Sequence, residues 1–394
     1  MERIGIFGGT FNPPHTGHIR AAVRGAEALG LDKVVLIPAR QVPGKQMPEG
    51  SPTPEQRLEM VRLAAAPYPI LEVSDLEVRA QGSSYTWQTL RTLGERYPGA
   101  ELTLMVGSDR LLSLPKWKQA EEIVKTAAIA VMPRGGKQEK NLLLPGINAL
   151  EEMGATVTTA ETVPCEISST QLRRLLAFRC ASEFLDPAVE DYIRKNSLYH
   201  TVSDWNRLPM DRLEQVVIGL LNPNRVRHVL GCRDTAVELA KRWGADTEDA
   251  ARAGMLHDVT KALDGPLQLT LCRAYGTLLD DFSKKDPNTL HALTGSLVAE
   301  RIFGENKAVV SAIRHHTTGK ADMNTLEAII YVADYMEPNR DFPGVEELRK
   351  LAFSDLQAAL KLGLEMTLVH LKNQGSEVSP ESRQALEWLK GRGV

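Results

Sequence analysis

The pattern of apolar residues changes once along the 394-residue chain, near residue 203, and this change constrains the fold most. Before it, short apolar runs alternate with amphipathic stretches. The expected strands are 3–8, 33–38, 69–73, 102–106 and 127–132, and the expected helices include 18–29, 54–65 and 85–96. Strands that alternate with helices favour an α/β fold with a doubly wound parallel sheet.

After residue 203 only helical periodicity continues. The expected helices are 225–243, 247–256, 290–303, 325–336 and 353–372. The segment 204–209 reads as a linker. We therefore expect two domains, an α/β domain of residues 1–203 and an all-α helical bundle of residues 204–394.

Composition narrows the range of partners. Lys and Arg number 47 against 50 Asp and Glu, so the net charge of −3 argues against a nucleic-acid binder. No run reaches the roughly 20 apolar residues that span a bilayer. The four cysteines are far apart and form no C-x-x-C pair, which favours a reducing cytoplasm. The sequence leaves the oligomeric state open, a homo-oligomer included.

The first candidate site follows the first expected strand. Gly8 and Gly9 allow a sharp turn and close backbone approach to a ligand. A helix that begins near Thr16 directs its free N–H groups and positive dipole end at this turn, which suits a phosphate. His15 and His18 lie three residues apart, so both imidazoles can face one pocket and stabilise charge on a phosphoryl group.

This segment resembles the signature of the nucleotidyltransferase superfamily with an H-x-G-H motif. The matching residues are Gly8-Gly9-Thr10-Phe11-x-Pro13-x-His15-x-Gly17-His18. A second mark of the superfamily is a Ser/Thr-rich helix start followed by Arg. It is matched by Ile167-Ser168-Ser169-Thr170-Gln171-Leu172-Arg173, where a capped helix start and a guanidinium suit the β,γ-phosphates of ATP.

Within the superfamily the chain is most similar to nicotinate-nucleotide adenylyltransferases. The matching stretches include Pro43-Gly-Lys45, Arg57-x-x-Met60, Ser84-Tyr-Thr86, Gly107-Ser-Asp109, Leu114-x-x-Trp117 and Arg134-Gly135. The resemblance implies a Rossmann-like domain in which Trp117 and Thr86 flank the nicotinate ring. Gly107, Asp109 and Arg134 border the ATP site. Gln88 departs from the family, which usually carries Asp there.

The resemblance also implies the reaction. The phosphate of nicotinate mononucleotide attacks the α-phosphorus of ATP, with Mg²⁺ bridging phosphates, and gives deamido-NAD and pyrophosphate, a step of NAD biosynthesis. The implied catalytic residues are His15, His18 and Arg173. The implied binding residues also include Gly8, Gly9, Thr10, Phe11, Lys45, Ser168, Ser169 and Thr170.

The second candidate site is dispersed over the helical half. Imidazoles and carboxylates recur in apolar surroundings, at His228, His257, Asp258, His291, His316 and Asp334. Asp334 follows the apolar stretch 326–333, and a buried carboxylate must be paired or bound to metal. Mixed nitrogen and oxygen ligands suit Fe, Mn, Co or Zn, and a carboxylate can bridge two ions.

This set resembles the HD phosphohydrolase superfamily over residues 222–340, and more closely the symmetrical diadenosine tetraphosphate hydrolases. The matching residues are Arg225-x-x-His228, Ala253-Gly-Met-Leu-His257-Asp258-x-x-Lys261, Leu290-His291, Ile313-x-x-His316-Thr-Thr-Gly319 and Tyr331-x-Ala-Asp334-Tyr-x-Glu337-Pro-x-Arg340. The doublet His315-His316 contributes only its second member.

The resemblance implies a divalent transition metal, iron first. His228, His257, Asp258 and Asp334 would hold one ion, and His291 and His316 a second, with Asp258 as the bridge. Asp258 and Lys261 are the implied catalytic residues, and Lys261, Thr317 and Arg340 would neutralise the phosphate chain. Hydrolysis of diadenosine tetraphosphate would yield two ADP.

The sequence leaves alternatives for each half. The first could prefer nicotinamide mononucleotide; a phosphopantetheine enzyme ranks lower because it typically has Thr where His15 stands. The second could be a nucleotide-sensing regulatory module, or could hydrolyse a guanosine alarmone or a nucleoside monophosphate. The expected partners are small nucleotides, with no nucleic acid and no membrane.

Overall fold

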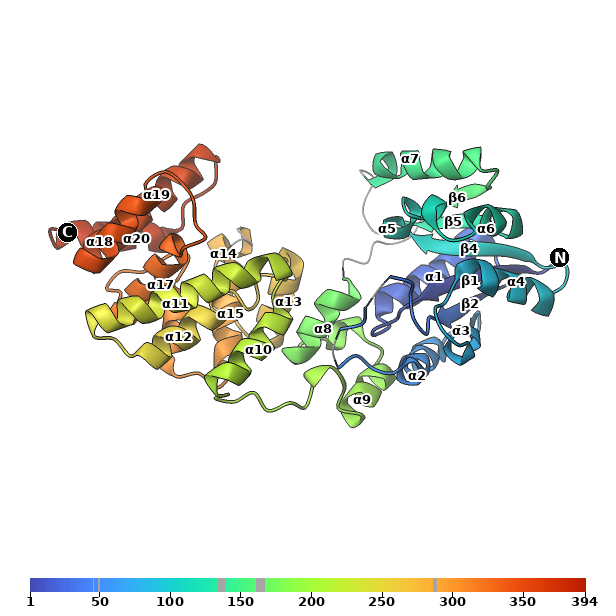
Figure 1. Ribbon diagram of the computed structural model, residues 1–394, viewed down its shortest axis with the longest axis horizontal. Coiled ribbons are helices and arrows are strands. Elements are labelled where there is room, and N and C mark those ends of the chain that lie inside the picture. Colours follow the sequence, from blue (N-terminus) through green and yellow to red (C-terminus); the bar gives the residue numbers. More distant parts are fainter. Residues whose placement is uncertain (45, 49, 134–138, 161–166, 286–288) are drawn as a thin grey trace. The chain divides into compact units, whose positions relative to one another are not determined.

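The computed structural model describes the whole chain except residues 45, 49, 134–138, 161–166 and 286–288. The chain divides into two compact units, Met1–Ser203 and Asp204–Val394, which are coloured blue to green and green to red in Figure 1.

The first unit is built on a six-stranded parallel sheet. Its order is β3-β2-β1-β4-β5-β6, which confirms the doubly wound α/β fold (Figure 1). The strands are β1 (Arg3–Gly9), β2 (Lys33–Pro38), β3 (Leu71–Val73), β4 (Glu101–Gly107), β5 (Ala128–Met132) and β6 (Val157–Thr159). The order reverses at β1 and β4, and ligands of such sheets bind at that switch point.

Helices α1 to α7 connect these strands, and α8 and α9 follow the last one. They are α1 (Thr16–Leu29), α2 (Pro54–Ala65), α3 (Leu76–Arg79), α4 (Thr86–Arg96), α5 (Ser108–Leu111), α6 (Ala120–Thr126), α7 (Glu139–Glu152), α8 (Ser169–Ala177) and α9 (Pro187–Lys195). Short 3₁₀ turns occur at Leu114–Lys116, Ser182–Phe184 and Leu198–His200. The β6 strand was not expected, because its three residues include two threonines and make no apolar run.

The sheet is buried on both faces, which explains its nearly continuous apolar strands. Ile4 and Ile6 belong to one core cluster with Leu90 of α4 and Ile123 of α6. Gly5 points the other way, and a Cβ there would lie 2.8 Å from side-chain atoms of Leu31 and Met105. The small residue therefore lets the elements on the second face pack closely against the sheet.

The second unit is helical throughout its described residues. Its helices are α10 (Met210–Leu220), α11 (Val226–Trp243), α12 (Thr247–Leu256), α13 (Gly265–Ala274), α14 (Asp281–Lys285), α15 (Leu290–Arg301), α16 (Lys307–Arg314), α17 (Thr325–Met336), α18 (Val345–Ser354), α19 (Leu356–Asn373) and α20 (Pro380–Gly391). A 3₁₀ turn, Pro223–Arg225, precedes α11. The central helix α17 is buried over almost its whole length and packs against α11, α12, α16 and α19.

The segment 204–209 is attached to the second unit instead of serving as a free linker. The Trp205 ring stacks on Phe303 with centroids 5.5 Å apart, and the Arg207 backbone N–H donates to the Phe303 carbonyl at 2.8 Å. Arg207 also donates to the buried Glu305 carboxylate at 2.9 Å, and Arg252 donates to the Leu208 carbonyl at 2.8 Å. The segment expected to join the two units therefore packs on the second one, through contacts that the sequence does not show.

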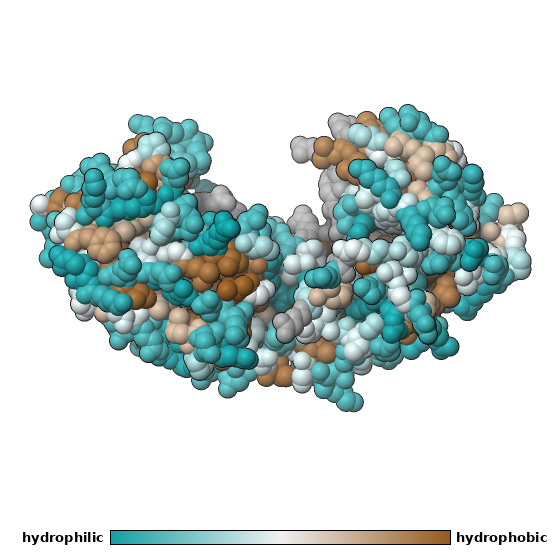
Figure 2. Space-filling view, in the orientation of Figure 1, coloured by the Kyte–Doolittle hydropathy of each residue, from teal (hydrophilic) through white to brown (hydrophobic). Residues whose placement is uncertain are grey.

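Surface polarity agrees with two globular units. On the face drawn in Figure 2, hydrophilic side chains cover most of each unit and apolar ones occupy separate small areas. Among the described residues, no helix is both long enough and apolar enough to cross a membrane.

Candidate active sites

The loop between β1 and α1 brings the first two histidines together. His15 is the N-cap of α1, and its backbone N–H donates to Nδ1 of His18 at 3.2 Å. The two rings lie side by side, with centroids 3.7 Å apart. Because Nδ1 of His18 accepts a hydrogen bond, a neutral His18 carries its proton on Nε2, where it can be donated to a phosphate oxygen.

The start of α8 contacts the same loop from far away in the sequence. Ser168 caps this helix by accepting a hydrogen bond from the Gln171 N–H at 3.2 Å. The Ser169 hydroxyl donates to the Pro13 carbonyl at 3.1 Å. Arg173 donates to the Asn12 carbonyl at 2.8 Å and also contacts the Thr170 hydroxyl at 3.1 Å. Two helix N-termini therefore meet at the β1–α1 loop.

Two further residues brace this loop and had no role in the sequence interpretation. Arg57 of α2 is only 1% exposed, and it donates to the Thr10 carbonyl at 2.6 Å and the Arg40 carbonyl at 3.0 Å. Burial lowers the pKa of the Arg57 guanidinium and raises that of the buried Tyr199 hydroxyl, which donates to Asn12 Oδ1 at 2.7 Å. Arg57 lies in a quoted motif, but its buried position could be seen only in the fold.

A cavity of about 470 Å³ opens beside this loop, at the carboxyl ends of β1, β2 and β4. Its lining contains the predicted residues Gly8, Gly9, Thr10, Thr86, Gly107 and Trp117. Other predicted residues in the described part of the chain lie outside this lining: Phe11, His15, His18, Asp109, Ser168, Ser169, Thr170 and Arg173. Lys45 and Arg134 lie outside the described residues.

The lining is mostly cationic where it is charged. Arg110, Lys116 and Lys118 contribute to it, against one carboxyl, that of Glu77. Burial raises the pKa of Glu77, although its carboxylate accepts a hydrogen bond from the Thr89 hydroxyl at 2.6 Å. The sequence analysis gave these three cations no role. The charge suits an anionic ligand.

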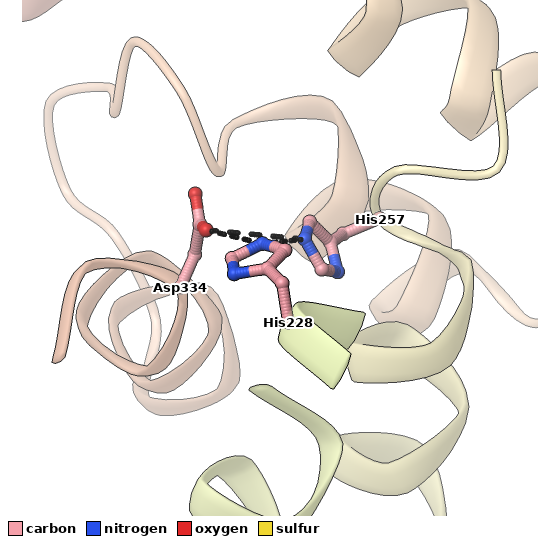
Figure 3. A group of neighbouring side chains, drawn as sticks. All are labelled: His228, His257 and Asp334. Atoms are coloured by element: carbon pink, nitrogen blue, oxygen red, sulfur yellow. Dashed lines mark hydrogen bonds and ion pairs between the residues drawn. The ribbon is translucent and has the colours of Figure 1, made fainter. Parts of the chain in front are cut away.

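The second site lies inside the helical unit, and Figure 3 shows three of its residues converging. His228 comes from α11, His257 directly follows α12, and Asp334 comes from α17. Nε2 of His228 lies 3.3 Å from Nε2 of His257 and 3.1 Å from Oδ1 of Asp334. These atoms are close enough to share one metal ion.

Asp258 lies between this group and a second pair of histidines. Its Oδ2 is 3.7 Å from Nε2 of His228 and 3.5 Å from Nε2 of His257. Its Oδ1 is 3.4 Å from Nε2 of His291 and 3.9 Å from Nε2 of His316. The Nε2 atoms of His291 and His316 are 3.2 Å apart. One carboxylate therefore faces four imidazoles.

Three imidazoles are oriented by contacts of their other ring nitrogen. Nδ1 of His257 faces the Gly254 carbonyl at 2.8 Å, and Nδ1 of His316 faces the Ile313 carbonyl at 2.7 Å. Nδ1 of His228 faces Glu337 Oε1 at 3.1 Å. A carbonyl only accepts hydrogen bonds, so the proton of a neutral ring sits on Nδ1 and the Nε2 lone pair points inward. Burial lowers the pKa of His316 to about 4, which keeps its ring neutral.

The donor set fits a divalent transition ion. Asp258 Oδ1 is buried and accepts no hydrogen bond from the described residues, although burial of an unpaired carboxylate oxygen is costly. Burial would raise the pKa of Asp258, but the positive charges of a protonated His257 and of the Arg225 guanidinium outweigh this and hold it well below its usual range. Inward-facing nitrogen lone pairs around an ionised carboxylate are an arrangement that a cation stabilises.

Two of the expected phosphate-binding residues, Lys261 and Arg340, contact residues of this cluster. Nζ of Lys261 is 3.1 Å from Nδ1 of His291. Arg340 donates to Asp334 Oδ1 at 2.7 Å, and the buried Thr317 hydroxyl has no hydrogen-bond partner among the described residues.

Two further residues, Arg225 and His315, adjoin the cluster in structure or in sequence. Arg225, which had no predicted role, donates from Nε to Asp258 Oδ2 at 2.6 Å. His315 contacts the Ser311 carbonyl of its own helix at 2.9 Å, so its Nδ1 is engaged away from the cluster.

Comparison with known proteins matches both halves. Residues 6–175 match the Cytidylyltransferase-like family and residues 225–339 match the HD domain family. The chain is 28% identical, over 93% of its length and the whole of the other protein, to a "Probable nicotinate-nucleotide adenylyltransferase/Ap4A hydrolase" of Mycoplasma pneumoniae.

Relatives of each half alone are more similar. The chain is 39% identical to a "Probable nicotinate-nucleotide adenylyltransferase" of Gloeobacter violaceus. This match covers half of the chain and 96% of the other protein. The chain is also 38% identical to a "Bis(5'-nucleosyl)-tetraphosphatase, symmetrical" of Bacillus subtilis. This match covers 43% of the chain and 91% of the other protein.

The parallel sheet with its glycine loop and the helical unit with its histidine cluster define a two-part enzyme, a nucleotidyltransferase joined to an HD-domain hydrolase. Its two halves match different relatives at more than a third identity over almost their whole length. The chain belongs to the nicotinate-nucleotide adenylyltransferase family through its first half and to the symmetrical bis(5'-nucleosyl)-tetraphosphatase family of HD domains through its second.

Proposed function

We propose that residues 1–203 transfer the adenylyl group of ATP to nicotinate mononucleotide, giving deamido-NAD and pyrophosphate. The observation that carries this proposal is the cavity at the switch point of the sheet, because the glycine loop and cationic side chains both line it. Both substrates are anionic, and the relatives of this half support the choice of mononucleotide.

The residues have distinct tasks in this proposal. Backbone groups of Gly8, Gly9 and Thr10, with the N-terminus of α1, bind the triphosphate. His18 donates from Nε2 to an oxygen of the reacting phosphate, and His15 supports its ring through the backbone hydrogen bond. Mg²⁺ supplies charge neutralisation between the phosphates.

The remaining predicted residues of this half position the substrates. Arg173 adds positive charge behind the loop while it holds the Asn12 carbonyl. Phe11 and the start of α8 (Ser168, Ser169 and Thr170) shape the loop. Trp117 and Thr86 border the nicotinate ring, and Gly107, Asp109, Lys45 and Arg134 border ATP.

A rate comparison tests this proposal. The purified chain with ATP and Mg²⁺ is offered nicotinate mononucleotide or nicotinamide mononucleotide, and the dinucleotide and pyrophosphate are measured. We expect faster turnover of the nicotinate substrate because its carboxylate adds negative charge in a cationic cavity. Equal or faster turnover of the nicotinamide substrate would contradict the substrate assignment, and no dinucleotide with either would contradict the reaction.

We propose that residues 204–394 hydrolyse diadenosine tetraphosphate to two ADP. The observation that carries this proposal is Asp258, whose two carboxylate oxygens face two different groups of imidazoles. His228, His257, Asp258 and Asp334 would hold one divalent ion, for which we propose iron, and His291 and His316 with Asp258 a second. Such ions supply a water that is ionised near neutral pH.

The chain's own cations then act on the substrate. Lys261 and Arg340 lie at the rim of the cluster and neutralise the phosphate chain, and the unpartnered Thr317 hydroxyl donates to a phosphate oxygen. Cleavage breaks a P–O bond at the central bridging oxygen. Water contributes its oxygen to one ADP, and a proton goes to the other.

Product analysis by chromatography tests this proposal. Metal-loaded protein with diadenosine tetraphosphate should release ADP as the nucleotide product. ATP with AMP would show asymmetric cleavage and contradict the proposal. Binding without product would favour the alternative in which this unit is a nucleotide sensor.

A further inference from the structure

The metal cluster has one supporting carboxylate that the proposed chemistry does not use. Glu337 directly follows α17, is 1% exposed, and places Oε1 3.1 Å from Nδ1 of His228. The corresponding contacts of His257 and His316 are made to neutral backbone carbonyls. Among these three rings, His228 alone has a carboxylate behind it.

Glu337 is held in this position by its own partners. The Asn339 backbone N–H donates to Oε2 at 2.7 Å, and the Asn339 side chain donates to the same oxygen at 2.8 Å. The Asn339 amide is anchored in turn to the Arg227 carbonyl at 3.2 Å. Gly231 of α11 leaves room for the carboxylate, because a Cβ at this residue would collide with Oε2. Oε1 is therefore directed at His228 by the surrounding structure.

The His291 side of the cluster has the opposite support. Nζ of Lys261 lies 3.1 Å from Nδ1 and 3.3 Å from Nε2 of His291, and an ammonium can only donate a hydrogen bond. A cation withdraws electron density from the ring that it contacts, whereas a carboxylate that accepts from Nδ1–H makes Nε2 a stronger metal ligand. The His228 side also has Asp334 in addition to its share of Asp258.

We propose that the two halves of the metal centre are unequal and that Glu337, as a positioning residue, sets the difference. The half formed by His228, His257 and Asp334 binds a divalent ion first and more tightly, and the half formed by His291 and His316 binds second. The inference rests on the proposed metal centre and is independent of the nucleotide that the centre acts on.

Metal titration tests this ranking without any substrate. The full chain, stripped of metal with a chelator, is titrated with Co²⁺ while visible absorption and bound metal are measured. Wild type should show two classes of sites. Glu337→Gln should weaken the tighter class by about 10–100-fold, the usual cost of losing a partner of a ligating histidine, and change the weaker class much less.

Two further variants separate ligand support from folding. Gly231→Ala keeps the Glu337 charge but displaces the carboxylate, so it should also weaken the tighter class. Glu327→Gln is the matched control: Glu327 is a fully buried carboxylate on α17 whose partners are Ser311, Lys320 and the Asn324 cap. It should leave both Co²⁺ affinities unchanged even where the melting temperature falls.

Three results would overturn the proposal: a single class of sites in wild type, unchanged Co²⁺ binding in Glu337→Gln, or an equal loss in the Glu327→Gln control. Absence of Co²⁺ binding in wild type would refute the proposed metal centre itself. Normal Co²⁺ binding without hydrolysis of diadenosine tetraphosphate would refute only the proposed substrate of the second unit.

Discussion

The two candidate sites recruit their polar atoms in different ways. The site of the first unit is built on a backbone turn between β1 and α1, and its histidines are neighbours in the sequence. The site of the second unit uses side chains from five helical regions between His228 and Asp334. Backbone N–H groups suit phosphates, whereas imidazole and carboxylate side chains suit a transition ion.

The difference predicts how each site tolerates substitution. A phosphate site that relies on backbone groups loses charge stabilisation when a side chain is removed, but it keeps most of its binding. A metal site loses its ion when a shared ligand is removed, because no other group replaces it. The predictions below test this contrast, beginning with the largest expected effect.

Asp258→Ala should abolish hydrolysis by the second unit. We expect metal affinity to fall by more than the roughly 100-fold that losing a supporting partner can cost, since Asp258 faces both histidine groups. Metal content and ADP release measure the effect. Adenylyl transfer by the same chain is the internal control and should not change. Retained metal with full hydrolysis would contradict the assignment.

His18→Ala should lower the turnover number of adenylyl transfer by about 10²–10³-fold, the cost of one donor to a charged transition state. The KM for ATP should change much less. Steady-state kinetics separate the two parameters. The exposed His200, at the end of the same unit, supplies the control His200→Ala, which should behave as wild type. An unchanged turnover number in His18→Ala would rule out the proposed role.

Arg57→Met should destabilise the first unit by about 1.5–3 kcal/mol, because it leaves the Thr10 and Arg40 carbonyls without their charged donor. Amide hydrogen exchange in β1 and β2 measures this change. Arg62→Met, on the exposed side of the same helix, should cost less than about 1 kcal/mol. Equal losses in the two variants would show that the buried bracing is unimportant.

Glu77→Gln should produce the smallest effect, and one that depends on pH. Burial raises the pKa of Glu77 in the folded state above its ordinary value of 4.5. The folded state then holds this proton more tightly, so the free energy of unfolding of wild type falls as pH rises from 4.5 through the raised pKa. The variant lacks this loss and should gain stability relative to wild type over that range. A difference that does not vary with pH would contradict the burial argument.

The architecture could be predicted because its signals are local. Five of the six strands and the helices α1, α11, α12, α15 and α17 coincide with apolar periodicity, and the fold class is confirmed. The sixth strand, Val157–Thr159, pairs only with β5 and has no apolar run, so periodicity could not find it. The contacts of segment 204–209 could not be predicted, because its polar and proline residues are compatible with both an exposed and a packed segment.

The candidate sites divide in the same way. The quoted motifs name the residues that meet at the β1–α1 loop and at the histidine cluster, and their roles stay predictions. The motifs also contain Arg57 and Glu337 but do not show that each is buried against a carbonyl or an imidazole. Tyr199 lies 187 residues from its partner Asn12, and only tertiary structure joins them.

The clasp formed by Trp205, Arg207 and Glu305 has a practical consequence for anyone who separates the halves. A fragment that starts at α10 would lose the stacked indole and leave the Arg252–Glu305 pair open to solvent on one side. The cleaner cut falls before Asp204. Trypsin should accordingly spare the bond after Arg207 in the native protein, although it cleaves after arginine in an unfolded chain.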